Sequence, residues 1–151
     1  DDINSAIFAL FGASKGNGLS GEASANSVLV LVASTPATNT AVVSGDFSQF
    51  GSVDFGRSPQ QDSFSTTAYN NTTINATGRS DISKTGVSKF GIRNGWDFDN
   101  TTTGLTWASG STQQISVNHA EHAGTSNDPK LEVTHGVVAG KRSRYIGLGF
   151  L

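Results

Sequence analysis

Two aspartates, Asp97 and Asp99, flank Phe98 and offer the closest approach in this sequence to a pair of catalytic carboxylates. A glycoside hydrolase needs two such groups about 5–9 Å apart in a cleft. Together with Asn100, the same residues also supply the oxygen ligands that a hard cation such as Ca²⁺ prefers. The spacing is not that of an EF-hand loop, so we expect either a solvated loop or a calcium site at Asp97, Asp99 and Asn100. No other cofactor is expected.

Histidines form the second group with metal-binding chemistry. His119 and His122 lie three residues apart beside Glu121, and His135 closes a later predicted strand. A His-x-x-His pair can bind a transition metal, but in a strand-to-loop region residues three apart do not face one another as they do on a helix. We therefore interpret these residues as exposed loop histidines.

Nucleophilic catalysis has no support in the sequence. Serines are abundant, but there is no Gly-x-Ser-x-Gly elbow and no base placed beside a serine by a known motif. Cysteine is absent, which excludes thiol catalysis and disulfides. We expect a protein without catalytic residues that is not an enzyme.

Polar and aromatic surface groups suggest contact with sugars. Tyr69 and Trp96 are candidates for stacking on pyranose rings, because an aromatic face matches the apolar face of a sugar. Trp107 lies inside a strand pattern and is expected in the core. The Asn-x-Ser/Thr pattern occurs at four positions, and such acceptor sites also arise by chance in Asn/Thr-rich chains. The candidate glycosylation sites are Asn70, Asn71, Asn75 and Asn100.

Composition places the 151 residues in one extracellular-type domain. Hydrophobic residues make up 35% and charged residues 15%, so the chain is apolar enough to fold. The net charge of −2 with scattered cations provides no basic face for nucleic acid. Apolar runs reach only about six residues against the roughly 20 that span a bilayer, so we expect no membrane insertion. The start at Asp1-Asp2 suggests a cleaved leader or a truncated edge, and the Ser/Thr/Asn/Gly-rich composition suits a cell surface or virion surface.

Short β patterns dominate the chain. Residues 7–11 and 28–33 are apolar runs that the simplest interpretation joins as a long hairpin. Residues 45–51 predict a single helical turn with Phe47 and Phe50 tucked against the core, and residues 79–85 predict one short helix. Further strands are predicted at 52–55, 72–76, 87–93, 105–107, 113–118, 130–135 and 145–150. Roughly nine short strands are typical of an all-β jelly roll or β-sandwich.

The C-terminal segment, residues 136–151, is treated as an extension of a domain formed by residues 1–135. A basic run, Lys141-Arg142-Ser143-Arg144, precedes Tyr145, and then Ile146, Leu148 and Phe150 alternate with glycine or end the chain with Leu151. Such alternation suits a strand pressed against a second backbone. Two interpretations stay open: the last strand of this domain, or a strand that pairs with another chain.

Three stretches resemble the C-terminal part of the DNRLRE-type jelly-roll modules. They are residues 46–51 (DFSQFG), 82–93 (ISKTGVSKFGIR) and 124–134 (GTSNDPKLEVT), of which the closing Pro-x-Leu-Glu-Val-Thr is the most specific. Such modules occur in bacterial and archaeal surface proteins and in phage or metagenomic structural proteins. The resemblance spans about residues 3–135. It implies an extracellular jelly roll for surface display, adhesion or polysaccharide binding, with no catalytic residues.

The chain departs from that family at both ends. The family's earlier portion, which supplies its first strands, is absent before Ile3, and the extension lies outside the pattern. We therefore expect an unpaired edge or open groove that a neighbour's tail fills through Tyr145, Ile146, Leu148 and Phe150. This predicts a non-enzymatic subunit of an extracellular filament or virion appendage, a homopolymer. The alternative is a monomeric carbohydrate-binding or adhesion module of a larger surface protein; a hydrolase would need a carboxylate cleft that the sequence does not offer.

Overall fold

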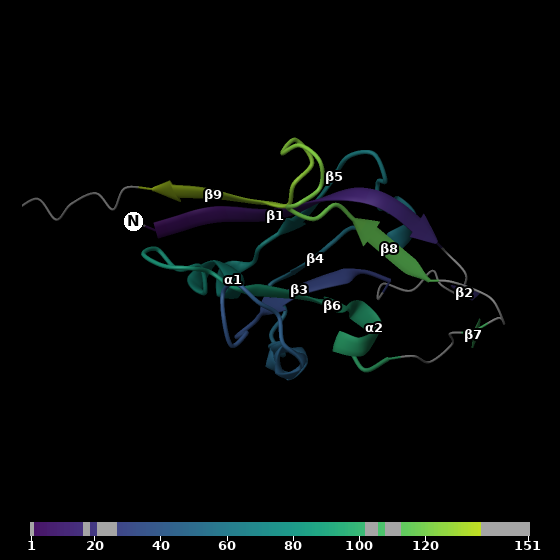
Figure 1. Cartoon of the computed structure of the whole chain (residues 1–151), viewed down its shortest axis with the longest axis horizontal. Coiled ribbons are helices and arrows are strands. Elements are labelled where there is room, and N and C mark those ends of the chain that lie inside the picture. Colours follow the sequence, from purple (N-terminus) through teal and green to yellow (C-terminus); the bar gives the residue numbers. More distant parts are fainter. Residues whose placement is uncertain (1, 17–18, 21–26, 102–105, 108–112, 137–151) are drawn as a thin grey trace, which may run out of the picture.

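The computed structural model of the chain describes residues 2–16, 19–20, 27–101, 106–107 and 113–136. These residues form mainly β-strands in two antiparallel sheets, with a few short helical turns (Figure 1). The all-β prediction is confirmed at this level.

The first sheet is built around one long strand, β1 (Asp2–Gly16). The β-forming run Ile-Phe-Ala-Leu-Phe lies at its centre, where β-branched and aromatic side chains favour the extended chain. β5 (Tyr69–Thr73) pairs with it from Ile7 to Phe11. β8 (Gln114–Val117) pairs with the second half of β1, and β9 (Lys130–Gly136) pairs with its first half. Both run antiparallel to β1, and together they cover almost its whole length.

The second sheet has the order β4-β3-β6. Its middle strand is β3 (Leu29–Ala33), between β4 (Gly56–Arg57) and β6 (Phe90–Asn94). A separate two-stranded pair is formed by β2 (Leu19–Ser20) and β7 (Thr106–Trp107). Because β3 is apolar in continuous sequence, both of its faces are covered, as expected for a buried strand.

Short helical turns connect these strands. They are the 3₁₀ helices η1 (Ser44–Gln49) and η2 (Gln61–Ser63) and the α-helical turns α1 (Ala76–Ser80) and α2 (Gly95–Phe98). Asn75 begins α1, because its side-chain oxygen accepts a hydrogen bond from the backbone N–H of Gly78 at 3.0 Å.

The core lies between the two sheets. Its buried side chains come from both layers and from the segments that join them: Ala6, Leu31, Phe55, Ile74 and Ile82. A second cluster of Val28, Val30 and Val32 lies on the other face of β3 and packs against Phe98 of α2. Burial of these apolar side chains is the main favourable contribution to folding.

Within the described ranges, backbone hydrogen bonds join the two layers along one side. Phe55 donates its N–H to the carbonyl of Leu31 at 2.9 Å and accepts one from Asn75 at 2.8 Å, which links the β3 layer to the end of β5. Gly56 then passes directly against the backbone of Thr73. On the opposite side the outer strands are β6 in one layer and β8 and β9 in the other, and no strand pairing among the described residues joins them.

Several local predictions are wrong in position or partner. Residues 7–11 and 28–33 are strands, but they lie in different sheets and form no hairpin. The helix expected at residues 79–85 lies at 76–80, and residues 52–55 form no strand. The free edge expected at the N-terminal strand is only partly present, because β9 pairs with β1 along Asp2–Ala9 and β5 pairs with it along Ile7–Phe11. Among the described residues, β9 is one of the strands that have a single partner.

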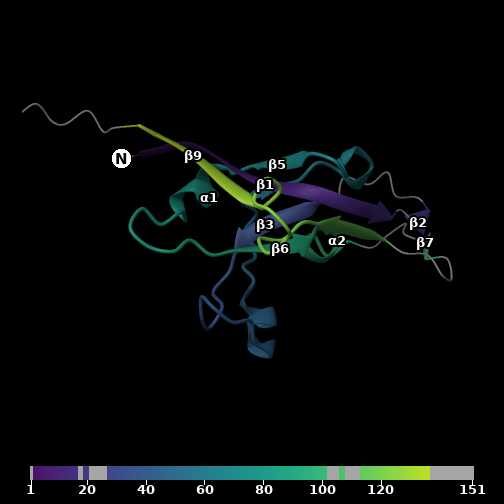
Figure 2. The same ribbon diagram turned by 45° about the horizontal axis from the view of Figure 1, so that its top comes forward.

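The helical turn expected at residues 45–51 is confirmed as η1, but it does not pack on the core. Figure 2 shows the segment that contains η1 projecting away from the sheets. Phe47 is 85% exposed, so its apolar character is not explained by burial within the domain. The sequence pattern predicts a helical turn here, but it does not predict whether the turn packs against the core.

Gly56→Ala should destabilise the fold, because a Cβ at this position would press into the backbone oxygen of Thr73 where the two layers join. We expect a loss of about 1–3 kcal/mol, the usual cost of overpacking. The matched control is Gly45→Ala, where a Cβ would meet no atom within 4 Å. Urea unfolding of both variants tests this; an equal effect of the two substitutions would contradict it.

Candidate functional site

A groove on the open side of the molecule, along β9, is the candidate site. One wall is made by alternate residues of β9, namely Leu131, Val133 and His135, which share a face because side chains alternate along a strand. The other wall comes from the segment between α1 and β6, and Ile3 of β1 completes the lining. The cavity volume is about 500 Å³. Its opposite wall consists of Ile82, Ser83, Lys84 and Ser88.

Large apolar side chains in this groove are left partly uncovered. Leu131 and Val133 are each 38% exposed, although they lie on the inner face of β9. Within the described ranges β9 has β1 as its sole strand partner, so its outer backbone edge carries hydrogen-bonding groups that no strand uses. An apolar groove beside an unpaired edge is the arrangement that accepts an additional strand.

The wall opposite β9 is held in place by its own hydrogen bonds. Ile82 anchors it in the core at 8% exposure. Ser83 donates its N–H to the hydroxyl of Ser88 at 2.9 Å and accepts the N–H of Gly86 at 2.8 Å. Lys84 at the rim lies 3.9 Å from the carboxylate of Asp2. The segment is therefore a locally bonded turn, which preserves the width of the groove.

The apolar surface continues beyond this groove. Ser88 also lines a neighbouring hollow of about 500 Å³, which shares Phe90 and Val42 with a third hollow of about 580 Å³ beside Phe47. Val42 is 90% exposed. Three adjoining hollows therefore extend from β9 to the projecting η1 segment.

The η1 segment keeps its shape through Asp46. The carboxylate accepts the backbone N–H groups of Ala37 at 2.9 Å and Val43 at 3.0 Å. These hydrogen bonds lower the pKa of Asp46, because they favour the ionised form. The carboxylate of Asp46 is thus hydrogen-bonded within the segment, and the exposed side chains of Val42 and Phe47 lie on this same segment, which carries no other charge.

The two aspartates that could have acted as a catalytic pair are instead ion-paired with arginines. Asp99 accepts a bidentate pair of hydrogen bonds from Arg57 at 2.7 and 2.8 Å, and Asp97 binds Arg93 at 2.8 Å. The two guanidinium groups lie 5.6 and 5.4 Å from the ring centre of Phe98. A calcium ion at Asp97, Asp99 and Asn100 would have to displace both arginines.

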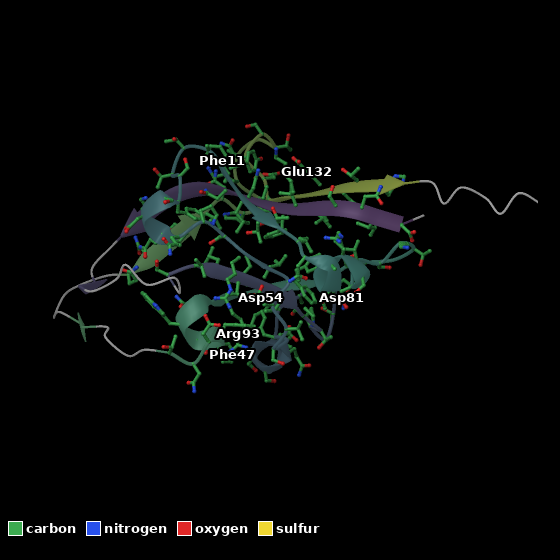
Figure 3. All side chains as sticks on the ribbon, turned by 180° about the vertical axis from the view of Figure 1, so that it is seen from behind. Phe11, Phe47, Asp54, Asp81, Arg93 and Glu132 are labelled. Carbon is green, nitrogen blue, oxygen red and sulfur yellow. The ribbon has the colours of Figure 1, made fainter. Side chains whose placement is uncertain are left out.

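Arg57 also binds Asp54 at 2.7 Å, and its pair with Asp99 joins β4 to the end of α2. The hydrogen bonds to Asp99 raise the pKa of Arg57, and the same guanidinium lowers the pKa of Asp99. Figure 3 shows Asp54 and Arg93 in the layer opposite to Phe11 and Glu132. Sequence reasoning missed both arginines: Arg57 lies 42 residues before Asp99, whereas the four-residue spacing of Arg93 and Asp97 was a local signal that could have indicated their pairing.

The two aromatic residues proposed to stack on sugars are not available for it. Trp96 is 7% exposed, so the expected surface role is wrong. Tyr69 donates its hydroxyl to the carbonyls of Ser126 and Asp128 at 2.8 and 2.9 Å and holds the loop before β9. Its ring is covered by Lys130, whose ammonium lies 3.7 Å from the ring centre.

The four candidate glycosylation sites differ in accessibility. Asn70 is 4% exposed, and its amide binds backbone groups of Ser65 at 2.7 and 2.9 Å, so modification there is incompatible with this fold. Asn75 is exposed, but its amide nitrogen donates to the carbonyl of Asp54 at 2.7 Å. Asn71 and Asn100 are exposed. Asn100 has a positive φ of 49°, a conformation that asparagine tolerates well.

The histidines are spread over two places. His119 and His122 lie in an exposed turn, where the ring of His119 accepts the N–H of Glu121 at 3.2 Å, whereas His135 lies in the groove. Across the described residues, no three histidine or acidic groups come close enough to hold a metal ion.

Comparison with protein-family models, with curated proteins and with solved structures finds no match. The resemblance to the DNRLRE-type modules therefore stays a prediction. None of the described helices is long and apolar enough to cross a membrane. The predicted assembly residues Tyr145, Ile146, Leu148 and Phe150 lie outside the described residues.

Trp96→Ala should act on stability rather than on sugar binding, because the indole is buried. We expect a loss of about 3–5 kcal/mol in the free energy of unfolding, the usual cost of truncating a buried aromatic residue. Phe47→Ala is the matched control, since Phe47 is 85% exposed and its truncation should change stability by less than about 0.5 kcal/mol. Chemical unfolding that gives equal losses for the two variants would contradict the burial of Trp96.

The ion pair of Asp99 should make stability depend on pH in the acid range. Its pKa lies below the ordinary value of about 3.9, so its contribution is complete above that value and is lost as the pH falls further. Asp99→Asn and Arg57→Gln should each flatten the stability profile below about pH 4. Unfolding measured from pH 7 to pH 2 tests this, and a variant profile as steep as that of the wild type would refute it.

Proposed function

We propose that this chain is a non-enzymatic assembly module that accepts an additional β-strand along β9. The single observation that supports this most strongly is the combination of an unpaired strand edge with a groove lined by partly exposed Leu131 and Val133. Strand addition satisfies both needs, because the incoming backbone bonds the edge while alternate side chains fill the groove.

The occupant we propose is the C-terminal tail, Tyr145 to Leu151, of a neighbouring copy. The tail has as many residues as β9, seven each, so one can lie along the whole of the other. Alternation puts Ile146, Leu148 and Phe150 on one face, where they match an apolar groove, and leaves the two glycines on the other face. A tail donated from copy to copy is a head-to-tail contact, which produces a linear polymer.

This mechanism fits a structural subunit of an extracellular filament or virion appendage. The jelly-roll interpretation and the likeness to DNRLRE-type modules belong to the same proposal. They are supported by the way β1 pairs with β5, β8 and β9, which are all distant from it in the sequence, as in folds with long crossing connections.

The alternative function, a monomeric carbohydrate-binding module, depended on Trp96 and Tyr69 as stacking platforms. Because Trp96 is buried and the ring of Tyr69 is covered by Lys130, no described contact favours sugar stacking at these residues. Strand addition is therefore the function we propose.

Val133→Lys should abolish assembly, because a charge on the groove face opposes an apolar strand. Thr134→Lys is the matched control: it adds the same charge to the neighbouring residue, whose side chain points to the opposite face of β9. Size-exclusion chromatography with light scattering should give long polymers for the wild type and Thr134→Lys. It should give monomers of about 15.7 kDa for Val133→Lys, and correspondingly lighter monomers for a chain that lacks residues 145–151. A monomeric wild type, or polymers that still form after both Val133→Lys and removal of residues 145–151, would contradict the proposal.

A further inference from the structure

We infer that the added strand runs antiparallel to β9, with Tyr145 at the Gly136 end and Leu151 at the Lys130 end. This inference rests on the proposed function and specifies how the partner chain enters the groove. It assigns each tail side chain an opposite residue on β9.

The alternation of side chains restricts the register. Residues directly opposite each other on adjacent strands point to the same face of a sheet. Full overlap of the two seven-residue segments in the antiparallel direction places Ile146 opposite His135, Leu148 opposite Val133 and Phe150 opposite Leu131. These three residues of β9 are the ones that line the groove, so all three large tail side chains enter it.

A parallel strand would also put these side chains in the groove, so alternation does not decide the direction. The pairing pattern does favour one direction. Every strand pair in the described part of the chain is antiparallel, including the pairing of β9 with β1. A parallel strand on this edge would create a mixed sheet, with hydrogen bonds that are slightly less stable per residue.

The charges at the two ends of β9 do not separate the two directions. Asp2, which pairs with Gly136, lies 3.9 Å from Lys84, and Glu132 near the other end lies 3.7 Å from Lys130. The three cations that precede the tail, Lys141, Arg142 and Arg144, would therefore meet a lysine–carboxylate pair at either end. The antiparallel pairing pattern of the other strands is what favours the antiparallel direction.

Cysteine cross-linking reads out the direction, because the chain has no cysteine of its own. Cysteines are introduced at Glu132 or Thr134, on the face of β9 away from the groove, and at Gly147 or Gly149 in the tail. The antiparallel register places position 132 opposite 149 and position 134 opposite 147. The parallel register reverses both partners, so the four double variants form a complete comparison.

Purified double variants are assembled, oxidised and analysed on non-reducing gels, with mass spectrometry of the linked peptides. Single-cysteine variants are the controls, since they cannot form a bond between β9 and the tail. We expect inter-chain bonds for 132 with 149 and for 134 with 147, at least tenfold more abundant than for the reversed pairs. Inter-chain bonds mainly in the reversed pairs, 132 with 147 and 134 with 149, would show a parallel strand; this result would overturn the direction but not strand addition. Polymers without any of these bonds would overturn the register as well, and monomers without them would overturn the proposed function itself.

Discussion

The backbone bridge at Phe55 is the constraint on which the rest of the molecule depends. Its N–H and carbonyl each pair with a different segment, Leu31 of β3 and Asn75 after β5, so one residue holds the two layers together on that side. Its side chain is 3% exposed and fills the core between the same layers. Buried backbone groups must be paired, so this bridge determines both the spacing and the relative position of the sheets.

Backbone hydrogen bonds close one side, and on the opposite side the contacts between the described parts of the two layers are made by side chains. The ring of Phe90 in β6 lies 6.5 Å from Phe8 of β1 and 6.3 Å from Phe55, which fills the interior between the open edges. Beyond these rings, the turn around Ser83 and Ser88 is the described segment that lies across the groove from the inner face of β9. The groove is thus a direct consequence of joining two sheets along one edge. Proteins usually protect such an edge against pairing with other chains, so an edge left beside apolar side chains suggests a partner.

The sequence predicted the class of fold but not the contacts between distant segments. Alternation and apolar runs placed the strands at 28–33 and 130–135 close to their observed positions, since strand pattern is a local property. Which strands pair is a non-local property, and for this reason the expected hairpin between residues 7–11 and 28–33 is wrong. The same limit explains Trp96: a position beside a turn suggested exposure, whereas tertiary packing buried it.

The site was predictable in part. An open edge and an apolar tail were expected from the departures at the two ends of the chain, and the alternation of Leu131 and Val133 in the closing strand could have indicated the groove. The expectation of an unpaired edge at the N-terminal strand was only partly right, because β9 and β5, which lie more than 50 residues away in the sequence, pair with β1 along Asp2–Ala9 and Ile7–Phe11. The metal site at Asp97, Asp99 and Asn100 stays a prediction; in the structure Asp97 is paired with Arg93, four residues before it, and Asp99 with Arg57 of β4.

Hydrogen–deuterium exchange of the β9 amides tests strand addition most directly. In assembled wild-type protein, amides on the outer edge of Lys130–Gly136 should be protected by the added strand, and removal of residues 145–151 should abolish that protection. Amides of β3 should exchange equally slowly in both proteins, because β3 is paired on both sides within the domain. Outer-edge β9 amides that exchange at the same rate with and without the tail would contradict the account.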